Sequence, residues 1–348
     1  MTGLCKNNIS RAVWRPDAMP DSIQESAPEH TPVLLAETLR LLECRPGGRY
    51  VDATVGLAGH AAAILDRIQP GGLLIGLDRD EESLAVARLR LAPYAGSVRL
   101  LHENFRNLPL VLNNTGIRPV DGILADLGVS SFQLLAPERG FSFQADAMLD
   151  MRTDRTQRLT AADLVNSLGE EQLADVIARY GEERHARRIA RAIASARRKG
   201  PVTRCLQLAE IIRQAVPPRG MPAIHPATRT FQALRIAVNQ ELEGLDAFLT
   251  DAVSFLKTGG RLVVIAFHSL EDRIVKQTFR RLAGYCVCGR PSELCTCPRR
   301  PQARLVTPRV IRPSDAEVEM NPRSRSARLR CVERLEDLGP ASRAKGSS

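Results

Sequence analysis

Residues 50–60 read Tyr50-Val51-Asp52-Ala53-Thr54-Val55-Gly56-Leu57-Ala58-Gly59-His60, and an alanine-rich run with helical character, residues 61–68, follows at once. The β-prone start breaks at a glycine, which gives the order strand, glycine turn, helix. This order is typical of the first unit of a nucleotide-binding α/β sheet. Glycine lets a ligand approach the backbone, and the start of the helix offers N–H groups to its polar atoms. The Gly-x-x-Gly spacing is looser than Gly-x-Gly-x-x-Gly, so a tight turn without a ligand fits equally well.

The second predicted strand ends in an acid. Residues 72–77 form a continuous apolar run, as expected for a parallel strand buried on both faces, and Asp78 follows. An acid about 20 residues after the glycine turn suits the two hydroxyls of a ribose and disfavours a 2′-phosphate. The alternative role for Asp78 is the N-cap of a helix that starts near Glu81, and both roles can coexist.

Later strands complete the predicted sheet. Residues 98–101 lead into a polar loop with Phe105, which either stacks on an adenine or packs in the core. Residues 120–126 end at Asp126, again at the sheet edge where ligands bind, so we favour a functional role for it. A turn at Gly259-Gly260 precedes a fifth strand over 261–267. Two late β-prone runs, 304–311 and 326–333, would give seven strands with an antiparallel edge.

A helical insertion interrupts this α/β pattern. Residues 137–226 show no strand pattern, and helical stretches are predicted over 161–166, 172–180, 182–198 and 206–216. Within it, residues 184–199 carry seven basic side chains and no acid, which favours contact with phosphates over a merely solvated face. The basic side chains are Arg184, Arg187, Arg188, Arg191, Arg197, Arg198 and Lys199.

The composition limits the partners and the compartment. The 348 residues carry 49 basic and 39 acidic side chains, a net charge of +10 that indicates a polyanionic partner. Apolar runs are too short for a membrane span, and residues 1–29 do not resemble a secretory signal, so we expect a cytoplasmic protein with reduced cysteines. Residues 1–29 and 337–348 are predicted to be a disordered arm and tail.

Four of the eight cysteines fall within 12 residues, at Cys286, Cys288, Cys295 and Cys297. Four thiolates are a familiar tetrahedral zinc set, and a metal would tie down a loop of little apolar content. The C-x-C spacing is tighter than the usual C-x₂₋₄-C, so a loop with reduced, unligated thiols is the competing interpretation.

Several longer motifs occur in order along residues 30 to 335. Together they resemble the bacterial RsmH (MraW) family, S-adenosylmethionine-dependent methyltransferases that modify a cytosine N4 amine of 16S rRNA. The motifs include Gly56-Leu57-Ala58-Gly59-His60, Asp126-Leu127-Gly128-Val129-Ser130-Ser131, Glu138-Arg139-Gly140-Phe141-Ser142-Phe143, Leu149-Asp150-Met151-Arg152 and Phe267-His268-Ser269-Leu270-Glu271-Asp272-Arg273.

The resemblance implies a class I (Rossmann-like) S-adenosylmethionine-dependent methyltransferase sheet interrupted by a helical insertion domain. It places a methyltransferase domain in residues 30–136 and 227–336, and RNA recognition in 137–226. The implied substrate is cytosine 1402 of 16S rRNA in the small ribosomal subunit, with no membrane or DNA partner. The implied cofactor-binding residues are Ala58, Gly59, His60, Asp78, Phe105, Asp126 and Gln133.

The resemblance does not identify the residue that binds the target amine. Many amino-methyltransferases have Asp/Asn-Pro-Pro-Tyr after the fourth strand, whereas this chain has Asp126-Leu127-Gly128-Val129, so Asp126 is our candidate catalytic residue. The family usually reads Gly-Gly-His where this chain has Ala58-Gly59-His60, which matters only if Ala58 has a positive φ. A catalytically inactive rRNA assembly factor is the competing function. An NAD-dependent oxidoreductase is disfavoured by the loose glycine spacing.

Overall fold

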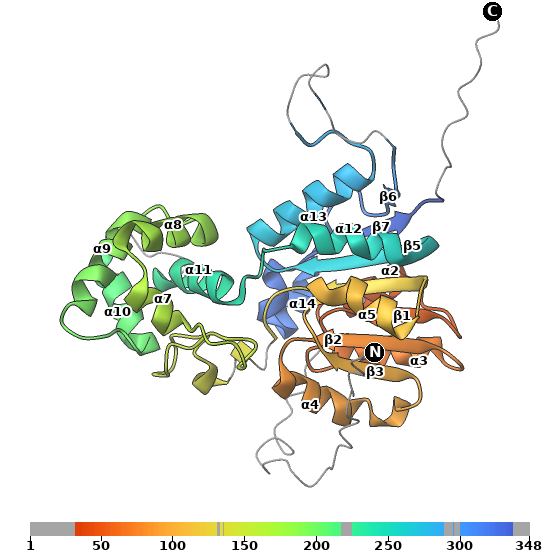
Figure 1. Cartoon of the computed structure of the whole chain (residues 1–348), viewed down its shortest axis with the longest axis horizontal. Helices are drawn as coiled ribbons and strands as arrows, with labels where there is room; N and C mark the ends of the chain where they lie inside the picture. The colour runs from red at the N-terminus through yellow and green to blue at the C-terminus, as the bar shows by residue number, and fades with distance from the viewer. Residues whose placement is uncertain are drawn as a thin grey trace, which may run out of the picture. The chain divides into compact units, whose positions relative to one another are not determined.

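The computed structural model describes residues 32–130, 133–134, 136–216, 225–288, 295 and 300–336. Residues 1–29 and 337–348, for which the sequence predicts disorder, lie outside these ranges. A seven-stranded sheet of order β3-β2-β1-β4-β5-β7-β6 runs through the described chain (Figure 1). The strands are β1 (Arg49–Asp52), β2 (Leu73–Asp78), β3 (Val98–His102), β4 (Val120–Asp126), β5 (Leu256–Ala266), β6 (Ala303–Leu305) and β7 (Arg328–Arg334).

Strands β1 to β5 are parallel to one another, and β7 pairs antiparallel with both β5 and β6. The predicted seven strands with an antiparallel edge are therefore confirmed. The predicted turn at Gly259-Gly260 is wrong, because these glycines lie within β5. There the pairing of β4 with β5 shifts register between Val120 and Gly122, which absorbs the irregularity.

Alternating side chains of each central strand supply two apolar faces. Ile123 and Ala125 of β4 join the core under one set of helices, whereas Leu124 joins the core on the opposite face. The first set is α5 (Leu108–Thr115), α12 (Leu245–Phe255) and α13 (Ser269–Leu282); the second includes α2 (Leu35–Leu42), α3 (Gly59–Ile68) and α4 (Glu81–Arg90). A short helix, α14 (Asp315–Met320), precedes β7.

The helices between β4 and α12 group together (Figure 1), and their buried side chains form a third apolar core. They are α7 (Ala161–Ser167), α8 (Glu170–Gly181), α9 (Ala186–Arg197), α10 (Cys205–Ala215) and α11 (Ala227–Asn239). Phe231 and Leu234 of α11 belong to this core, whereas residues from 227 onward were predicted to belong to the sheet domain. We call α7–α11 the helical cluster.

The side-chain amide of Asn239 is buried where the chain passes from the helical cluster back to the sheet. Asn239 is 1% exposed and uses every polar atom of its side chain. Its Oδ1 accepts from the N–H and hydroxyl of Thr153, each at 2.8 Å, and its Nδ2 donates to the carbonyls of Met151 and Arg235. The guanidinium of Arg79, which follows β2, donates to the main-chain carbonyl of Asn239 at 2.7 Å. These bonds connect the sheet edge to the helical cluster.

Candidate active site

A row of carboxylates follows the carboxyl ends of four neighbouring strands. Asp78, Asp52 and Asp126 are the last residues of β2, β1 and β4, and Glu271 lies in the first turn of α13, directly after β5. Because these strands are adjacent in the order β2-β1-β4-β5, acids far apart in the chain become electrostatic neighbours. We call these four residues the acidic row. Ligands of open α/β sheets bind at this edge.

Asp78 holds the glycine turn. Its Oδ2 accepts from the Gly56 N–H at 2.7 Å and its Oδ1 accepts from the Asp80 N–H at 2.9 Å. Burial raises the pKa of Asp78 to about 6, against the lowering effect of these two bonds. Each oxygen keeps a lone pair for a further donor, as a ribose hydroxyl would require. The alternative role as a helix cap is wrong, because Asp80 caps α4 by accepting from the Glu82 N–H.

Asp52 is almost completely buried, with 1% of its surface exposed. Its Oδ1 accepts from the Thr54 N–H at 3.1 Å, whereas its Oδ2 has no hydrogen-bond partner among the described residues. Burial, with a smaller contribution from the nearby Asp78, raises the pKa of Asp52 to about 7. An unsatisfied buried carboxylate oxygen is costly, and a cationic ligand at this edge would remove that cost.

Asp126 lies beside His60. The His60 Nδ1 is 3.5 Å from Asp126 Oδ2, and its Nε2 lies 3.0 Å from the Val33 carbonyl. Because a carbonyl only accepts, Nε2 carries the proton that bonds to Val33, and Nδ1 faces the Asp126 carboxyl group. Burial, then the charges of Asp52 and Glu271, raise the pKa of Asp126 well above its ordinary value. Its Oδ1 is buried without a partner among the described residues.

The glycine turn differs from the sequence expectation at two positions. Ala58 has φ 64° and no exposed surface, so it occupies the left-handed region where the family's usual glycine carries no penalty. Gly59 does not clear space for a ligand: a Cβ there would lie 2.5 Å from Cγ of Pro32. Gly56, with φ 52°, has only Ser130 near its missing Cβ, at 3.9 Å, and is the glycine that leaves open space.

The other two predicted cofactor residues have protein partners. Phe105 packs against the core under α12, with its ring centroid 4.8 Å from that of Phe248, so the core alternative is correct for part of its surface. Gln133 is 4% exposed; its Nε2 donates to Asp80 Oδ2 at 2.6 Å, and its Oε1 accepts from the Ser130 N–H. Gln133 therefore ties the segment after β4 to the turn after β2.

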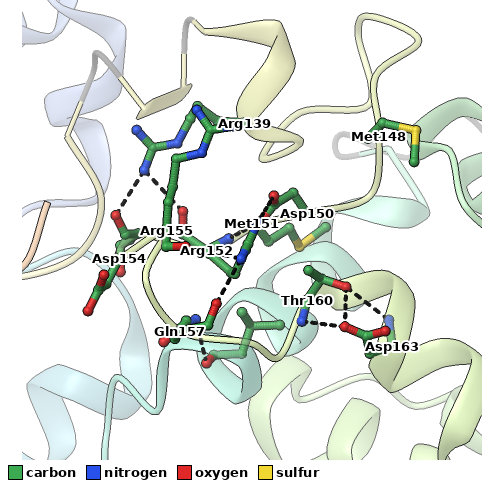
Figure 2. A network of polar contacts seen from close by, with 12 residues as sticks. Arg139, Met148, Asp150, Met151, Arg152, Asp154, Arg155, Gln157, Thr160 and Asp163 are labelled. Carbon is green, nitrogen blue, oxygen red and sulfur yellow. Dashed lines mark hydrogen bonds and ion pairs between the residues drawn. The ribbon is translucent and has the colours of Figure 1, made fainter. Parts of the chain in front are cut away.

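Arg139 extends this tie into the segment that leads to the helical cluster (Figure 2). Its guanidinium is 3.0 Å from Asp80 and 2.7 Å from Glu82, and it also donates to the carbonyls of Arg152 and Thr153. With 2% of its surface exposed, Arg139 is a buried ion-pair partner. Farther along the same segment, Arg152 forms a bidentate ion pair with Asp150.

A second polar group, after β5, was missed by sequence reasoning. Arg235 binds Glu241 through two bonds of 2.8 and 2.9 Å, and His268 Nε2 lies 3.6 Å from Glu241 and 3.3 Å from Glu271. Burial would lower the pKa of His268, but the two glutamates outweigh burial and raise it to about 9. Glu271 Oε2 accepts from the Phe267 N–H at 2.9 Å. With these partners the group is an ion-pair network beside the acidic row. The motif around His268 was the only signal for it.

The basic side chains of the helical cluster are only partly available. Arg187 and Arg188 are exposed and have no ion-pair partner within the described ranges. Arg191 pairs with Glu170 at 3.3 Å, and Arg197 donates to the Val165 carbonyl. Arg184 precedes α9, so it lies outside the helix that carries Arg187, Arg188 and Arg191, although a helix was predicted over 182–198.

No described helix is long and apolar enough to cross a membrane.

Comparisons with known proteins agree with the fold and the motifs. The MraW methylase family matches residues 27–335. A protein of Syntrophobacter fumaroxidans named ribosomal RNA small subunit methyltransferase H is 53% identical over 307 residues, 88% of this chain and 96% of the relative. The proteins of the same name from Symbiobacterium thermophilum and Geobacter sulfurreducens are each 54% identical over 308 residues, covering 88% of this chain and 97% and 99% of theirs.

Proposed function

The chain belongs to the MraW methylase family, and we propose that it transfers a methyl group from S-adenosylmethionine to the N4 amine of cytosine 1402 in 16S rRNA. The fold is the predicted class I methyltransferase sheet interrupted by helices. The observation that carries the proposal is the acidic row with two buried oxygens, on Asp52 and Asp126, that have no partner in the part of the chain that the structure describes. S-adenosylmethionine carries a positive sulfonium and an ammonium group, so a row of carboxylates fits its charge.

The cofactor is held, in this proposal, by the residues at the ends of β1, β2 and β4. Asp78 accepts the ribose hydroxyls, Phe105 offers the free part of its ring to the adenine, and Ala58, Gly59 and His60 line the first turn. Asp126, at the end of β4, lines the site on the side opposite β2. Gln133, whose amide is bound to Asp80 and Ser130, holds the segment after β4 against the cofactor.

We assign the target amine to Asp126, because a cationic sulfonium bound beside it would favour the ionised carboxylate over the protonated form that burial favours. The N4 amine of cytosine is a weak nucleophile because its lone pair is delocalised into the ring. A carboxylate that accepts one N–H hydrogen bond directs the amine and then takes the proton that leaves after methylation. His60 Nδ1 lies 3.5 Å from Asp126 Oδ2, so it is the next group to which that proton can move. Alignment of the reacting atoms supplies about 7–11 kcal/mol, and unstacking the cytosine costs a few kcal/mol.

RNA recognition is assigned to the helical cluster and to the arginine-rich segment near β7. Residues 298–330 contain nine arginines and three acids. Arg309, Arg312 and Arg325 are exposed there. Phosphate contacts from such side chains position an RNA without reading its sequence. A ribosomal substrate also implies a cytoplasmic location.

The test is methylation of small ribosomal subunits that lack the modification. Labelled S-adenosylmethionine is incubated with the subunits and either the wild-type chain or Asp126→Asn, and the labelled nucleotide is mapped by nuclease digestion and mass spectrometry. We expect N4-methylcytidine at position 1402 with the wild-type chain and a loss of at least about 100-fold with Asp126→Asn. Label at another nucleotide would refute the proposed target, and no label on any subunit would favour the inactive assembly factor.

A further inference from the structure

Three cysteines converge after α13, away from the acidic row. The Sγ atoms of Cys286 and Cys288 are 3.5 Å apart, those of Cys286 and Cys295 are 3.4 Å apart, and those of Cys288 and Cys295 are 3.6 Å apart. The three sulfur atoms thus form a nearly equilateral triangle. A disulfide would need about 2.05 Å between two sulfur atoms, so no pair of the three is covalently joined.

The triangle has the size of one face of a tetrahedral thiolate site. Sulfur atoms bound to one zinc ion at about 2.3 Å lie about 3.8 Å apart, a few tenths of an ångström more than the separations here. The sequence raised the objection that the C-x-C step is too tight for joint coordination. The 3.5 Å between Cys286 and Cys288 answers it, because these two thiols already face a common point.

Apolar burial does not explain why these three thiols lie together. Cys286 and Cys288 are exposed and Cys295 is partly exposed, so apolar burial does not hold them. Thiols are also weak hydrogen-bond donors. The connection from α13 to β6 is closed at its base by the Gln302 N–H, which donates to the Leu282 carbonyl at 2.8 Å. Beyond this base, the Tyr285 side chain is 52% exposed, so it is not packed in an apolar core.

We propose that Cys286, Cys288 and Cys295 bind a structural zinc ion that orders the connection between α13 and β6. Three thiolates with one further ligand make a tetrahedral set. Cys297 lies outside the described residues. Metal binding converts the thiols to thiolates and releases their protons. The site serves the fold and is separate from methyl transfer.

The test measures metal in the full-length protein, expressed with zinc in the medium and purified without chelator. Elemental analysis is expected to find about one zinc per chain in the wild type and less than about 0.2 in Cys288→Ser. Cys44→Ser is the matched control: it removes a thiol near the end of α2, outside the cysteine cluster, and keeps its zinc. Should Cys288→Ser fail to fold, cobalt reconstitution of the wild type decides, because tetrahedral thiolate coordination gives intense charge-transfer and visible bands.

Three outcomes would overturn the proposal: less than about 0.1 zinc per wild-type chain together with no cobalt spectrum, iron in place of zinc, or full zinc retention by Cys288→Ser. None of these measurements uses methyl transfer. The zinc site and the proposed activity can therefore fail independently.

Discussion

Ala58 occupies a backbone conformation that favours glycine. A left-handed φ costs an alanine about 1–2 kcal/mol. Glycine removes this cost, but its greater conformational freedom in the unfolded chain offsets part of the gain. We therefore expect Ala58→Gly to raise the free energy of unfolding by about 0.5–1 kcal/mol, measured by denaturant titration. The control Ala63→Gly, in the middle of α3, should lower it by about 1 kcal/mol. A loss of stability in Ala58→Gly would show that the positive φ is not strained.

Asp78 allows a direct test of the ribose contact. Asp78→Asn keeps one carbonyl oxygen for the glycine turn but removes the charge, and a hydrogen bond to a charged group contributes about 1.5–3 kcal/mol. We expect the affinity for S-adenosylmethionine to fall by about 10- to 100-fold in calorimetry, with the circular dichroism spectrum unchanged. Asp66→Asn, at an exposed acid on α3, is the matched control. Equal affinity of Asp78→Asn and wild type would remove Asp78 from the site.

At this scale, part of the site was predictable from the sequence. Asp78 and Asp126 follow apolar runs, so their position at strand ends could be read directly. The positive φ of Ala58 and the contact of Gly59 with Pro32 could not, because backbone torsions and packing against a distant residue leave no local pattern. The protein partners of Gln133 were hidden for the same reason, since Asp80 is 53 positions away.

Among the elements, the segment between β4 and the helical cluster depends on Arg139. Arg139→Met leaves Asp80 as an uncompensated buried charge, which typically costs about 3–5 kcal/mol of unfolding free energy. Arg155→Met is the matched control, because Arg155 binds the same Glu82, at 2.9 Å, with 49% of its side chain exposed. That change should cost less than about 1 kcal/mol in the same denaturant titration. Similar losses in both variants would contradict the buried role of Arg139.

Helix α9 provides the test of RNA binding. Reversing Arg187 and Arg188 to Glu should weaken binding to small-subunit rRNA and reduce the slope of log affinity against log salt by about one for each lost phosphate contact. Arg213→Glu on α10 is the control, since Arg213 is exposed but paired with Glu210 at 2.6 Å. Binding measured at several salt concentrations separates the two. An unchanged slope in the double variant would mean that this face of α9 is only solvated.

The order of helices and strands was predicted well, and their limits less so. Apolar runs of parallel strands are legible in the sequence because both faces are buried. The start of β5 five residues early, at Leu256, depends on pairing with Val120 across the sheet, which no window of the sequence contains. The packing of α11 in the helical cluster likewise depends on contacts with helices far away in the sequence.

For the whole molecule, the acidic row predicts a pH dependence of cofactor binding. Burial raises the pKa of Asp78 to about 6 and that of Asp52 to about 7, so the cofactor-free protein carries protons there that a cationic ligand would expel. We expect affinity for S-adenosylmethionine to increase between pH 5.5 and 8, with proton release. S-adenosylhomocysteine lacks the sulfonium charge, so its affinity should increase less. Calorimetry in buffers of different ionisation enthalpy measures both, and equal pH slopes for the two ligands would contradict the prediction.

The strand order also determines when the sheet can close during synthesis. β4 lies between β1 and β5, and β5 begins at Leu256, whereas β4 ends at Asp126. In a nascent chain, β4 is therefore the edge of a four-stranded partial sheet while the whole helical cluster is being made. Its outer N–H and C=O groups stay unpaired by β5 for that interval. The acidic row gains Glu271 only after β5 has been made, so a complete site is a late product of translation.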